Sequence, residues 1–446
     1  MTTTRRALLG WAAGVGSGAD FGFGVGRAGG FVGGVRRAVG FAGGVGVAVA
    51  VGFGTGTPAA AAPRAPTVAP RAAAAGDWPL WRAYRARFVQ ADGRVIDDQH
   101  ATRYTTSEGQ AYTLFFALVA NDRPMFDTLL AWTERHLAGG DLAARLPGWR
   151  WGRHDDGRWA LVDANPAADA DLWLACTLFD AARLWAEPRY REIADALLRR
   201  IRTDETAELP GLGWMLLPAP AGFQLGTDRW RLNPSYLPIH QLRALDRLDP
   251  RGPWAAIATN TLAMLVAAAP RGFVPDWVNF SPAEGWHADA TSPAEGSYDA
   301  IRGYLWAGLL HTDDALKAPL LRALRGPRDW LRAHPGAVLP QRVRTDTGVA
   351  VGTGLAPPAF SAALLPYLRA LGEPALEAGQ RARLRGLVDA AGGAAGAVPS
   401  VVHDPARPNY YDQALLLFGM GALDGRYRFA ADGALQPAWA RGARRA

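Results

Sequence analysis

The sequence predicts an all-α fold, an (α/α)6 barrel (toroid) in which six inner helices are surrounded by six outer ones. Helical segments follow one another from residue 78 onward, and little between them alternates with the period of two that a large sheet requires. Every second segment is apolar on most faces, as buried helices are, and the others are amphipathic. The loops before the apolar segments are long and rich in Trp, Gly and Pro.

Twelve helices are expected, in two alternating sets. The apolar inner helices should begin near residues 108, 168, 235, 297, 360 and 411. Several outer helices begin after a proline, whose fixed φ suits a first helical turn. The outer segments are Trp78–Val89, Met125–Ala138, Arg189–Arg202, Trp254–Ala268, Leu316–His334 and Leu376–Ala391. Short β-hairpins can form in the loops near Trp149–Trp159 and Gly213–Trp230.

The chain divides into a leader, a folded part and a tail. Residues 1–76 are rich in Gly, Ala and Val, and contain Arg5-Arg6 followed by apolar residues, which is typical of a Tat export signal. Glycine dilutes every apolar stretch there, so no stable membrane span is expected. A low-complexity tail, or a start codon assigned too far upstream, is the alternative. Residues 77–436 should form one catalytic domain of a periplasmic or secreted protein, and residues 437–446 a basic C-terminal tail.

Composition argues against several kinds of partner. The formal net charge is +7, but residues 1–76 hold seven arginines against one aspartate, which accounts for +6 of it. The folded part is near neutral, so no nucleic-acid partner is expected. The single cysteine, Cys176, allows neither an internal disulfide nor a cysteine-based zinc site, and the eight histidines lack metal-like spacing. We expect a monomer with no metal and no cofactor.

The first inner helix begins with a carboxylate that its own cap does not need. Glu108 follows Thr106 and Ser107, which are helix-capping residue types, and Gly109 leaves room beside it. A glutamate in a first helical turn is ordinarily only a partner of the helix dipole. Glu108 gains a second interpretation because later inner helices repeat the arrangement.

Two further inner helices begin with aspartates. Asp169 and Asp171 stand at i and i+2, so they face different directions, and one can cap the helix while the other points into a cleft. Arg302 follows Asp299 at i+3, close enough to hold it ionised. Each aspartate alone is compatible with a capping role. Together with Glu108 they place carboxylates at the end of the barrel where its long loops gather.

Carboxylates paired across a cleft are the groups that glycoside hydrolysis needs. One stays protonated to protonate the leaving oxygen, and the other stays ionised to activate water or attack the anomeric carbon. Burial beside an aromatic ring raises a carboxyl pKa, and a nearby arginine lowers it. Glu108, beside Tyr112, therefore suits the acid, and Asp299, beside Arg302, suits the base, with Asp276 as the alternative base. Inversion and retention stay open at this point.

The chain resembles glycoside hydrolase family 8 in four motifs: TSEGQAY (106–112), ADADLWLAC (168–176), GSYDAIR (296–302) and NYYDQALLLFG (409–419). They stand in the right order across about residues 77–430, and the likeness is strongest to the periplasmic endoglucanases (cellulases) that accompany bacterial cellulose synthase. The resemblance implies an (α/α)6 barrel and endo-hydrolysis of β-1,4-glucan with inversion. It implies Glu108 as proton donor and Asp299 as general base. It maps the signature aspartate, labelled nucleophile in older usage, onto Asp169, which would bind and distort the sugar.

The chain departs from the family pattern at two positions. Ala168 stands where the family usually has Ser or Thr, which removes a hydroxyl beside Asp169 and bears on the fine positioning of that side chain. Leu174 stands where Ile or Met is usual, a core exchange of little consequence.

Residues near the helix starts are candidates for contacts with a sugar, because aromatic faces match the C–H faces of pyranose rings. The predicted substrate-binding residues are Tyr112, Trp151, Asp171, Tyr298, Arg302, Tyr410, Tyr411 and Asp412. Trp149, Trp151 and Trp159 are equally compatible with ordinary loop packing, and Asp412 can instead cap the last helix.

We therefore expect an endo-1,4-β-glucanase whose partners are a β-1,4-glucan and, further, a cellulose-synthase export complex. Two alternatives stay open. A xylanase or chitosanase would use the same fold, and a glucan-binding export factor would hold the polysaccharide without cleaving it.

Overall fold

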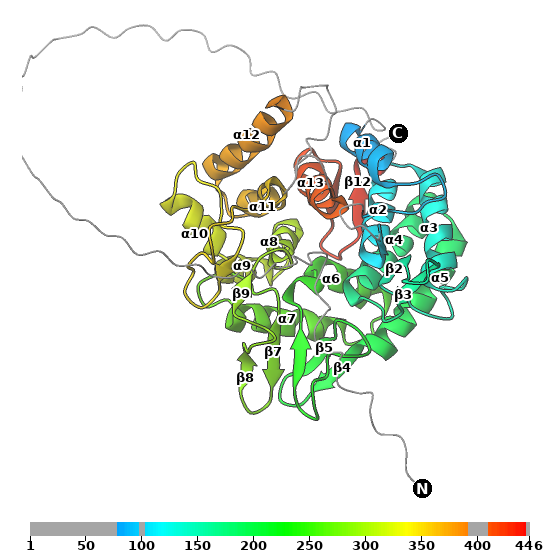
Figure 1. Ribbon diagram of the computed structural model, residues 1–446, viewed down its shortest axis with the longest axis horizontal. Helices are drawn as coiled ribbons and strands as arrows, with labels where there is room; N and C mark the ends of the chain where they lie inside the picture. Colours follow the sequence, from blue (N-terminus) through cyan, green and yellow to red (C-terminus); the bar gives the residue numbers. More distant parts are fainter. Residues whose placement is uncertain (1–77, 98–102, 391–408, 443–446) are drawn as a thin grey trace, which may run out of the picture. The chain divides into compact units, whose positions relative to one another are not determined.

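The computed structural model describes residues 78–97, 103–390 and 409–442, which belong to one compact unit (Figure 1). The predicted leader, residues 1–76 with its Tat-like signal, lies outside the described residues. Helices dominate the described part, and the predicted all-α (α/α)6 architecture is confirmed. Within the described residues, no helix has the length and apolar character needed to cross a membrane.

The inner ring of the described residues consists of six helices that lie around a common centre (Figure 1). Each contacts the next along the chain, and the last contacts the first, so the ring closes. Most of their residues are buried, which explains why their sequences are apolar on most faces. The inner helices are α2 (Ser107–Val119), α4 (Ala168–Trp185), α6 (Ile239–Leu248), α8 (Ala300–Leu309), α11 (Pro358–Ala370) and α13 (Tyr410–Leu423).

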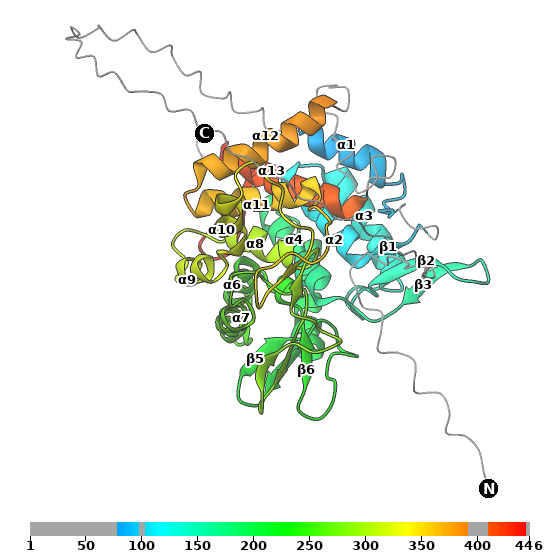
Figure 2. The ribbon, with the colours of Figure 1, turned by 60° about the vertical axis from the view of Figure 1, so that its left-hand side comes forward.

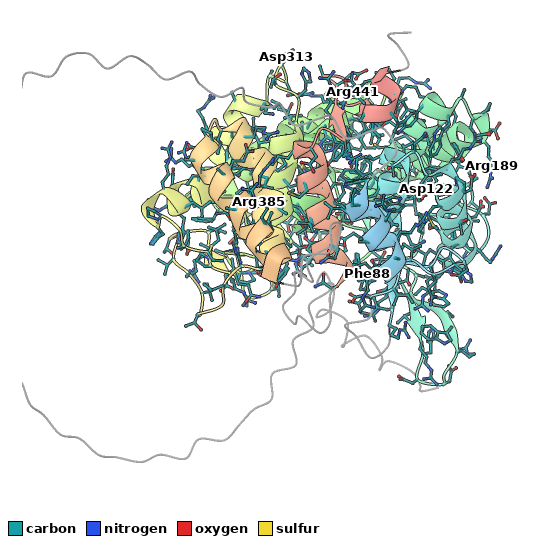
Figure 3. All side chains as sticks on the ribbon, turned by 90° about the horizontal axis from the view of Figure 1, so that it is seen from above. Phe88, Asp122, Arg189, Asp313, Arg385 and Arg441 are labelled. Atoms are coloured by element: carbon teal, nitrogen blue, oxygen red, sulfur yellow. The ribbon has the colours of Figure 1, made fainter. Side chains whose placement is uncertain are left out.

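The outer helices pack against the ring one by one. The pairs are α3 (Arg123–Leu137) with α2, α5 (Pro188–Arg200) with α4, α7 (Trp254–Ala268) with α6, α9 (Lys317–Ala323) with α8, and α12 (Pro374–Ala390) with α11. The first helix of the described chain, α1 (Pro79–Phe88), packs against α13 and so fills the sixth outer position. Charged side chains such as Arg189 of α5 and Arg385 of α12 are exposed to solvent (Figure 3).

One predicted outer helix is broken in two. Instead of a single helix over 316–334, the chain forms α9 and α10 (Gly326–Ala333). Pro327 cannot supply the backbone N–H that a continuous helix needs. Gly326 donates its N–H to Gly272 O at 3.0 Å, and a Cβ there would come within 2.7 Å of that backbone. A close approach of two chain segments therefore fixes the break.

Two inner helices begin later than predicted. The helix expected near residue 235 begins at Ile239, after a short 3-10 turn, η2 (Pro234–Tyr236), in which the side chain of Asn233 accepts the N–H of Ser235 at 3.0 Å. The helix expected near residue 297 begins at Ala300. Both shifts change which side chains stand at the mouth of the barrel.

Short antiparallel strands occupy the loops, and both predicted hairpin regions contain strands. Figure 2 shows β2–β3 and the strands around β5 and β6 extending away from the helices. The later strands were not predicted. The sheets are β1 (Thr105–Thr106) with β2 (Arg150–Arg153) and β3 (Trp159–Asp163); β4 (Thr206–Leu209) with β5 (Gly213–Leu216); β6 (Trp230–Leu232) with β7 (Val278–Ser281) and β8 (Gly285–His287); β9 (Glu295–Gly296) with β10 (Val343–Arg344); and β11 (Tyr427–Phe429) with β12 (Leu435–Pro437).

The folded part extends past the predicted boundary at residue 436. Residues Ala438–Gly442 form a short helix, α14. Trp439 donates its indole N–H to Leu118 O at 3.1 Å, and its ring stacks on that of Trp185 with 6.3 Å between centroids. The first residues of the predicted basic tail are therefore attached to α2 and α4.

Candidate active site

A single arginine joins the three carboxylates predicted to be catalytic. The side chain of Arg302, in α8, is fully buried. Its Nη1 donates to Glu108 Oε2 and, at 3.0 Å, to Asp169 Oδ2, while its Nη2 donates to Asp299 Oδ1 at 2.6 Å. The starts of α2, α4 and α8 are thus brought within the reach of one guanidinium group.

The start of α2 is built so that Glu108 faces this centre. Thr106 is the N-cap, and its hydroxyl accepts the N–H of Gly109 at 3.0 Å. Pairing of β1 with β2 holds the preceding residues, with Thr106 opposite Arg150. Within α2, which the structure describes in full, Glu108 is the least buried residue, and its side chain keeps 13% of its surface exposed. The capping role predicted for Thr106 leaves the Glu108 carboxylate available to the site.

Glu108 lies in surroundings that favour its protonated form. Its Oε1 accepts the hydroxyl of Tyr410 at 2.9 Å, and Tyr410 also shares a 2.8 Å hydrogen bond with Thr106. Burial raises the pKa of Glu108 above its ordinary value, and this effect exceeds the lowering by Arg302 and by the Tyr410 hydrogen bond. A carboxyl group with a raised pKa is suited to donate a proton near neutral pH.

Asp169 is the second carboxylate on Arg302. Its Oδ1 accepts the N–H of Ala170 at 2.8 Å, which leaves Oδ2 for Arg302. Burial raises its pKa to about 7, against the opposing effect of Arg302. The hydroxyl missing at Ala168 does not prevent this contact.

Asp299 is freed for Arg302 because another aspartate caps α8. Asp299 occupies the N-cap position but makes no capping hydrogen bond with its side chain. Instead, Oδ1 of Asp276 accepts the N–H groups of Ser297 and Ala300, both at 2.8 Å. Burial and the neighbouring Asp299 raise the pKa of Asp276 to about 7. Asp276, the alternative base, is therefore engaged with the backbone.

Two residues of the site were missed by sequence reasoning. Ser235 and Tyr236 lie in or at the end of the 3-10 turn η2, where the sequence pattern predicts the first turn of a helix. The Ser235 hydroxyl accepts Arg302 Nη2 at 3.1 Å, and the rings of Tyr236 and Tyr411 lie 5.4 and 5.6 Å from the guanidinium carbon. The Asn233-Pro234 pair, a turn signal, could have indicated that the helix begins later.

Three of the predicted substrate-binding residues, Tyr112, Asp171 and Asp412, are buried. Tyr112 is 1% exposed, accepts Arg302 Nη1 at 3.2 Å, and packs edge-on against Trp173. Asp412 is 0% exposed, and the residue that caps the last helix is Asn409 and not Asp412: the Asn409 side chain accepts the Asp412 N–H at 2.6 Å and donates to Asp412 Oδ2 at 3.2 Å. Asp171 is also 0% exposed. None of these three side chains presents an open surface to a ligand.

The predicted aromatic residues at the helix starts are held by the protein itself. Tyr298 accepts the hydroxyl of Tyr411 on its backbone carbonyl at 2.6 Å, and its own hydroxyl accepts Gln341 Nε2 at 3.0 Å. Tyr298 and Tyr411 are only partly buried, whereas Tyr410 is 5% exposed. Their rings are thus fixed beside the carboxylates before any ligand arrives.

The β2–β3 hairpin carries an aromatic stack. Trp151 is largely buried, and Trp159, which is 44% exposed, stacks on it with 5.2 Å between centroids. The guanidinium of Arg94 lies 4.6 Å from the first ring and 4.5 Å from the second. Because Trp151 pairs with Thr105 in β1, the stack is tied to the segment that leads into Glu108.

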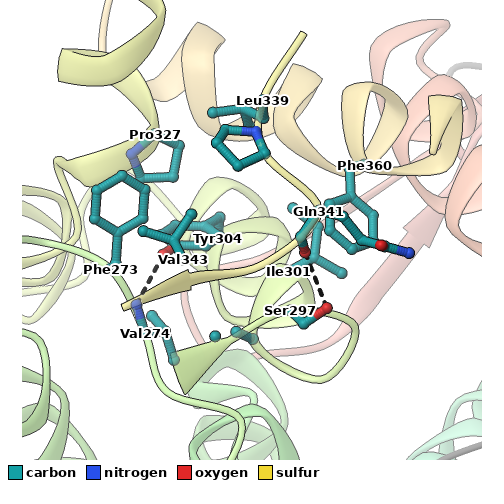
Figure 4. A pocket seen from close by; sticks show the side chains of 13 residues that line it. Phe273, Val274, Ser297, Ile301, Tyr304, Pro327, Leu339, Gln341, Val343 and Phe360 are labelled. Carbon is teal, nitrogen blue, oxygen red and sulfur yellow. Dashed lines mark hydrogen bonds between the residues drawn. The ribbon is translucent and has the colours of Figure 1, made fainter. Parts of the chain in front are cut away.

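A small cavity lies behind the start of α8 (Figure 4). Its volume is about 30 Å³, far below the several hundred Å³ of a ligand site, and its walls are mostly apolar. Two hydrogen bonds brace it, from Val274 N to the Tyr304 hydroxyl at 2.8 Å and from Ser297 Oγ to Gln341 O at 2.9 Å. The cavity belongs to the support of the segment that carries Asp299.

A ring of buried carboxylates around one cation, at the end of an (α/α)6 barrel, has the groups of a glycoside hydrolase centre. Among the residues that the structure describes, no cluster of His, Cys, Asp and Glu is arranged to hold a metal ion.

Comparison with known proteins agrees with this class. The model of glycosyl hydrolases family 8 matches residues 63–425. An endoglucanase of Xanthomonas axonopodis pv. citri is 48% identical over 364 residues, covering 82% of this chain and 90% of its own. An endoglucanase of Salmonella typhi is 42% identical over 368 residues, covering 82% and 93%. The crystal structure of an endo-1,4-D-glucanase from Vibrio fischeri ES114 is similar with a TM-score of 0.73 and 37% identity, over 81% of this chain and 99% of that one. The chain belongs to glycosyl hydrolase family 8.

Proposed function

We propose that this protein is an endo-1,4-β-glucanase that hydrolyses cellulose-type glucan with inversion. The observation that carries the proposal is the meeting of Glu108, Asp169 and Asp299 on Arg302. The relatives named above, which the chain matches over four fifths of its length, are endoglucanases. A xylanase or chitosanase of the same fold is the second candidate, but none of these three relatives is named as one.

In the proposed reaction, Glu108 is the proton donor. Burial keeps its proton in place, and Tyr410 fixes the direction of the carboxyl group. As the bond between two glucose units breaks, the proton passes from Glu108 to the leaving oxygen. Arg302 then stabilises the carboxylate that remains.

Asp299 is the proposed general base. Its Oδ1 is paired with Arg302 at 2.6 Å, and the cap supplied by Asp276 leaves its side chain free of the helix backbone. It takes a proton from water as that water attacks the anomeric carbon on the face opposite Glu108, which inverts the configuration. Asp169, between the two on Arg302, is proposed to bind the sugar at the cleavage point and distort it.

The glucan chain is proposed to run past the partly exposed aromatic residues. Tyr298 and Tyr411 flank the carboxylates, and Trp159 offers an exposed face on the β2–β3 hairpin. Aromatic faces stack on pyranose rings without requiring charge, which suits a neutral polysaccharide.

Export and a link to cellulose synthesis are further parts of the proposal. Arg5-Arg6 and the apolar residues after them support export by a Tat-type route. The likeness to endoglucanases that accompany cellulose synthase supports a role beside the nascent glucan. Cell fractionation of the full chain and of a chain lacking residues 1–76 tests export: only the full chain should reach the periplasm or medium.

The activity is tested on carboxymethylcellulose, xylan and chitosan. We expect release of reducing ends and a rapid fall in viscosity with the first substrate alone. Glu108→Gln should lose about 10²–10⁴ in kcat, as removal of a general acid does, while still binding the polymer. Binding without cleavage by the wild-type protein would support the export-factor alternative, and cleavage of xylan or chitosan in preference would support the second candidate.

A further inference from the structure

Two buried carboxyl groups outside the catalytic set face each other beneath the start of α4. Asp171 lies two residues after Asp169, and Glu205 ends a π-helical turn, η1 (Ile201–Glu205), that continues α5. Both side chains are 0% exposed. Each carboxyl group acts directly on the pKa of the other, and none of their four oxygens accepts a hydrogen bond from a donor of the described residues.

A hydrogen bond between two carboxyl groups requires a proton, because an ionised carboxylate can only accept. The charged groups that act on the pair are Asp169 and Asp204, both acidic, so a second negative charge would add repulsion. Burial raises the pKa of both Asp171 and Glu205 well above the ordinary values. A proton held between the two carboxyl groups would supply the donor that their four buried oxygens lack.

Backbone hydrogen bonds also connect Glu205 to the residue that precedes Asp169. The backbone carbonyl of Glu205 accepts the N–H of Leu217 at 2.7 Å. The next residue, Pro218, accepts the N–H of Ala168 at 3.0 Å on its carbonyl. Glu205 is thus connected to the first turn of α4 twice, through the 217–218 segment and through its own carboxyl group on Asp171.

The geometry of η1 explains how Glu205 reaches α4. A π-turn adds a residue to a helical turn, and such turns are rare and are often found near functional sites. The turn ends at Glu205, whose side chain is buried where η1 packs against α4.

We propose that Asp171 and Glu205 form a proton-sharing pair that fixes the first turn of α4 and so positions Asp169 on Arg302, without touching the substrate. Both are positioning residues, and the inference rests on the proposed role of Asp169 in the reaction. It also replaces the direct contact with substrate predicted for Asp171 from sequence.

Three variants separate positioning from direct chemistry. Asp171→Ala removes the hydrogen bond, and we expect kcat to fall by about 10-fold or more with KM within about 2-fold, as a small misplacement of a reacting group does. Asp171→Asn keeps a donor toward Glu205 and should retain kcat within about 3-fold. The matched control is Asp180→Ala, which removes another buried aspartate at the far end of α4, bonded to Arg183 at 2.5 Å, and should leave kcat unchanged.

The outcomes that would overturn the proposal are distinct. A folded Asp171→Ala enzyme with wild-type kcat means that the pair positions nothing. An Asp171→Asn enzyme as poor as Asp171→Ala means that the carboxylate itself acts. A rise in KM at constant kcat means that Asp171 contacts the substrate. If Asp171→Ala does not fold, Glu205→Ala, which removes the pair from the other side, takes its place.

The shared proton is tested without any measurement of activity. In the infrared difference spectrum between the wild-type protein and the Asp171→Asn/Glu205→Gln variant at pH 7, we expect a carbonyl band of a protonated carboxylic acid in the wild type only. A spectrum in which the variant loses only carboxylate bands would overturn the proton-sharing pair. This result stands whether or not the protein cleaves glucan, so failure of the pair and failure of the proposed function are distinguishable.

Discussion

Arg302 determines the electrostatics of the site at the level of single residues. It is a fully buried cation bonded to three carboxylates, so removing it leaves negative charge in a region of low polarity with no counterion. Burial raises the pKa of Glu108 and Asp169, whereas the positive charge of Arg302 lowers it. For both residues the effect of burial on the pKa is the larger.

Replacing Arg302 should therefore affect stability as well as activity. Arg302→Met should lower the free energy of unfolding by about 3–5 kcal/mol, the range for breaking a buried ion pair by removing one partner. Denaturant unfolding measures this change. Arg243→Met is the matched control, because the ion pair of Arg243 with Asp314 is partly exposed and its loss should cost less. An Arg302→Met protein as stable as this control would contradict the account.

The site is built from the first residues of inner helices. At the starts of α2 and α8 one side chain faces the Arg302 centre, while a different side chain accepts free backbone N–H groups of the helix. Thr106 caps α2 beside Glu108, and Asp276 caps α8 beside Asp299. Because one side chain caps the helix and another faces the centre, the two acidic residues at the start of α8, Asp276 and Asp299, have different roles.

The same division predicts different results for two neighbouring aspartates. Asp299→Asn should lose about 10² or more in kcat, because an amide cannot accept the proton of water. Asp276→Asn keeps an oxygen that can cap Ser297 and Ala300, so its kcat should stay within about 10-fold of wild type. Steady-state kinetics on one soluble glucan compares them. If the losses were reversed, Asp276 would be the base.

Sequence patterns were informative about these elements where the signal is local. The apolar inner segments predicted the ring, and Glu108, Asp169 and Asp299 were all singled out at helix starts. The pairings that complete the site are not local. Glu205 meets Asp171 from another helix, and no pattern along the chain indicates that contact.

Contacts between distant segments explain the other differences. The broken outer helix follows from the approach of Gly326 to Gly272, and the outer set is completed because α1 packs on α13, which lies at the opposite end of the described chain. Tyr236 was missed because a proline-containing 3-10 turn has the same local apolar pattern as the helix that follows it.

Buried carboxyl groups affect the stability of the whole domain. Asp169, Asp276 and Asp412 each have a pKa raised to about 7 by burial. In the unfolded chain these groups lose their protons near pH 4. Between pH 4 and pH 7 the folded state therefore binds more protons than the unfolded state. The free energy of unfolding should fall as pH rises from about 4 to about 7.

Thermal unfolding at several pH values checks this expectation. The melting temperature should be higher at pH 5 than at pH 8, at constant ionic strength. Asp412→Asn removes one of the three groups from outside the Arg302 centre and should make the decline shallower. A melting temperature that rises over this range would show that these carboxyl groups are ionised in the folded protein.

The central claim is that Glu108 and Asp299 act from opposite faces of the sugar, with water as the attacking group. Proton NMR of the first product released from a cello-oligosaccharide tests it most directly, because the anomeric signal is recorded before mutarotation. The account predicts the α-anomer as the initial product, which is inversion at the cleaved β-bond. Initial appearance of the β-anomer would mean retention through a covalent intermediate and would contradict the roles assigned to both carboxylates.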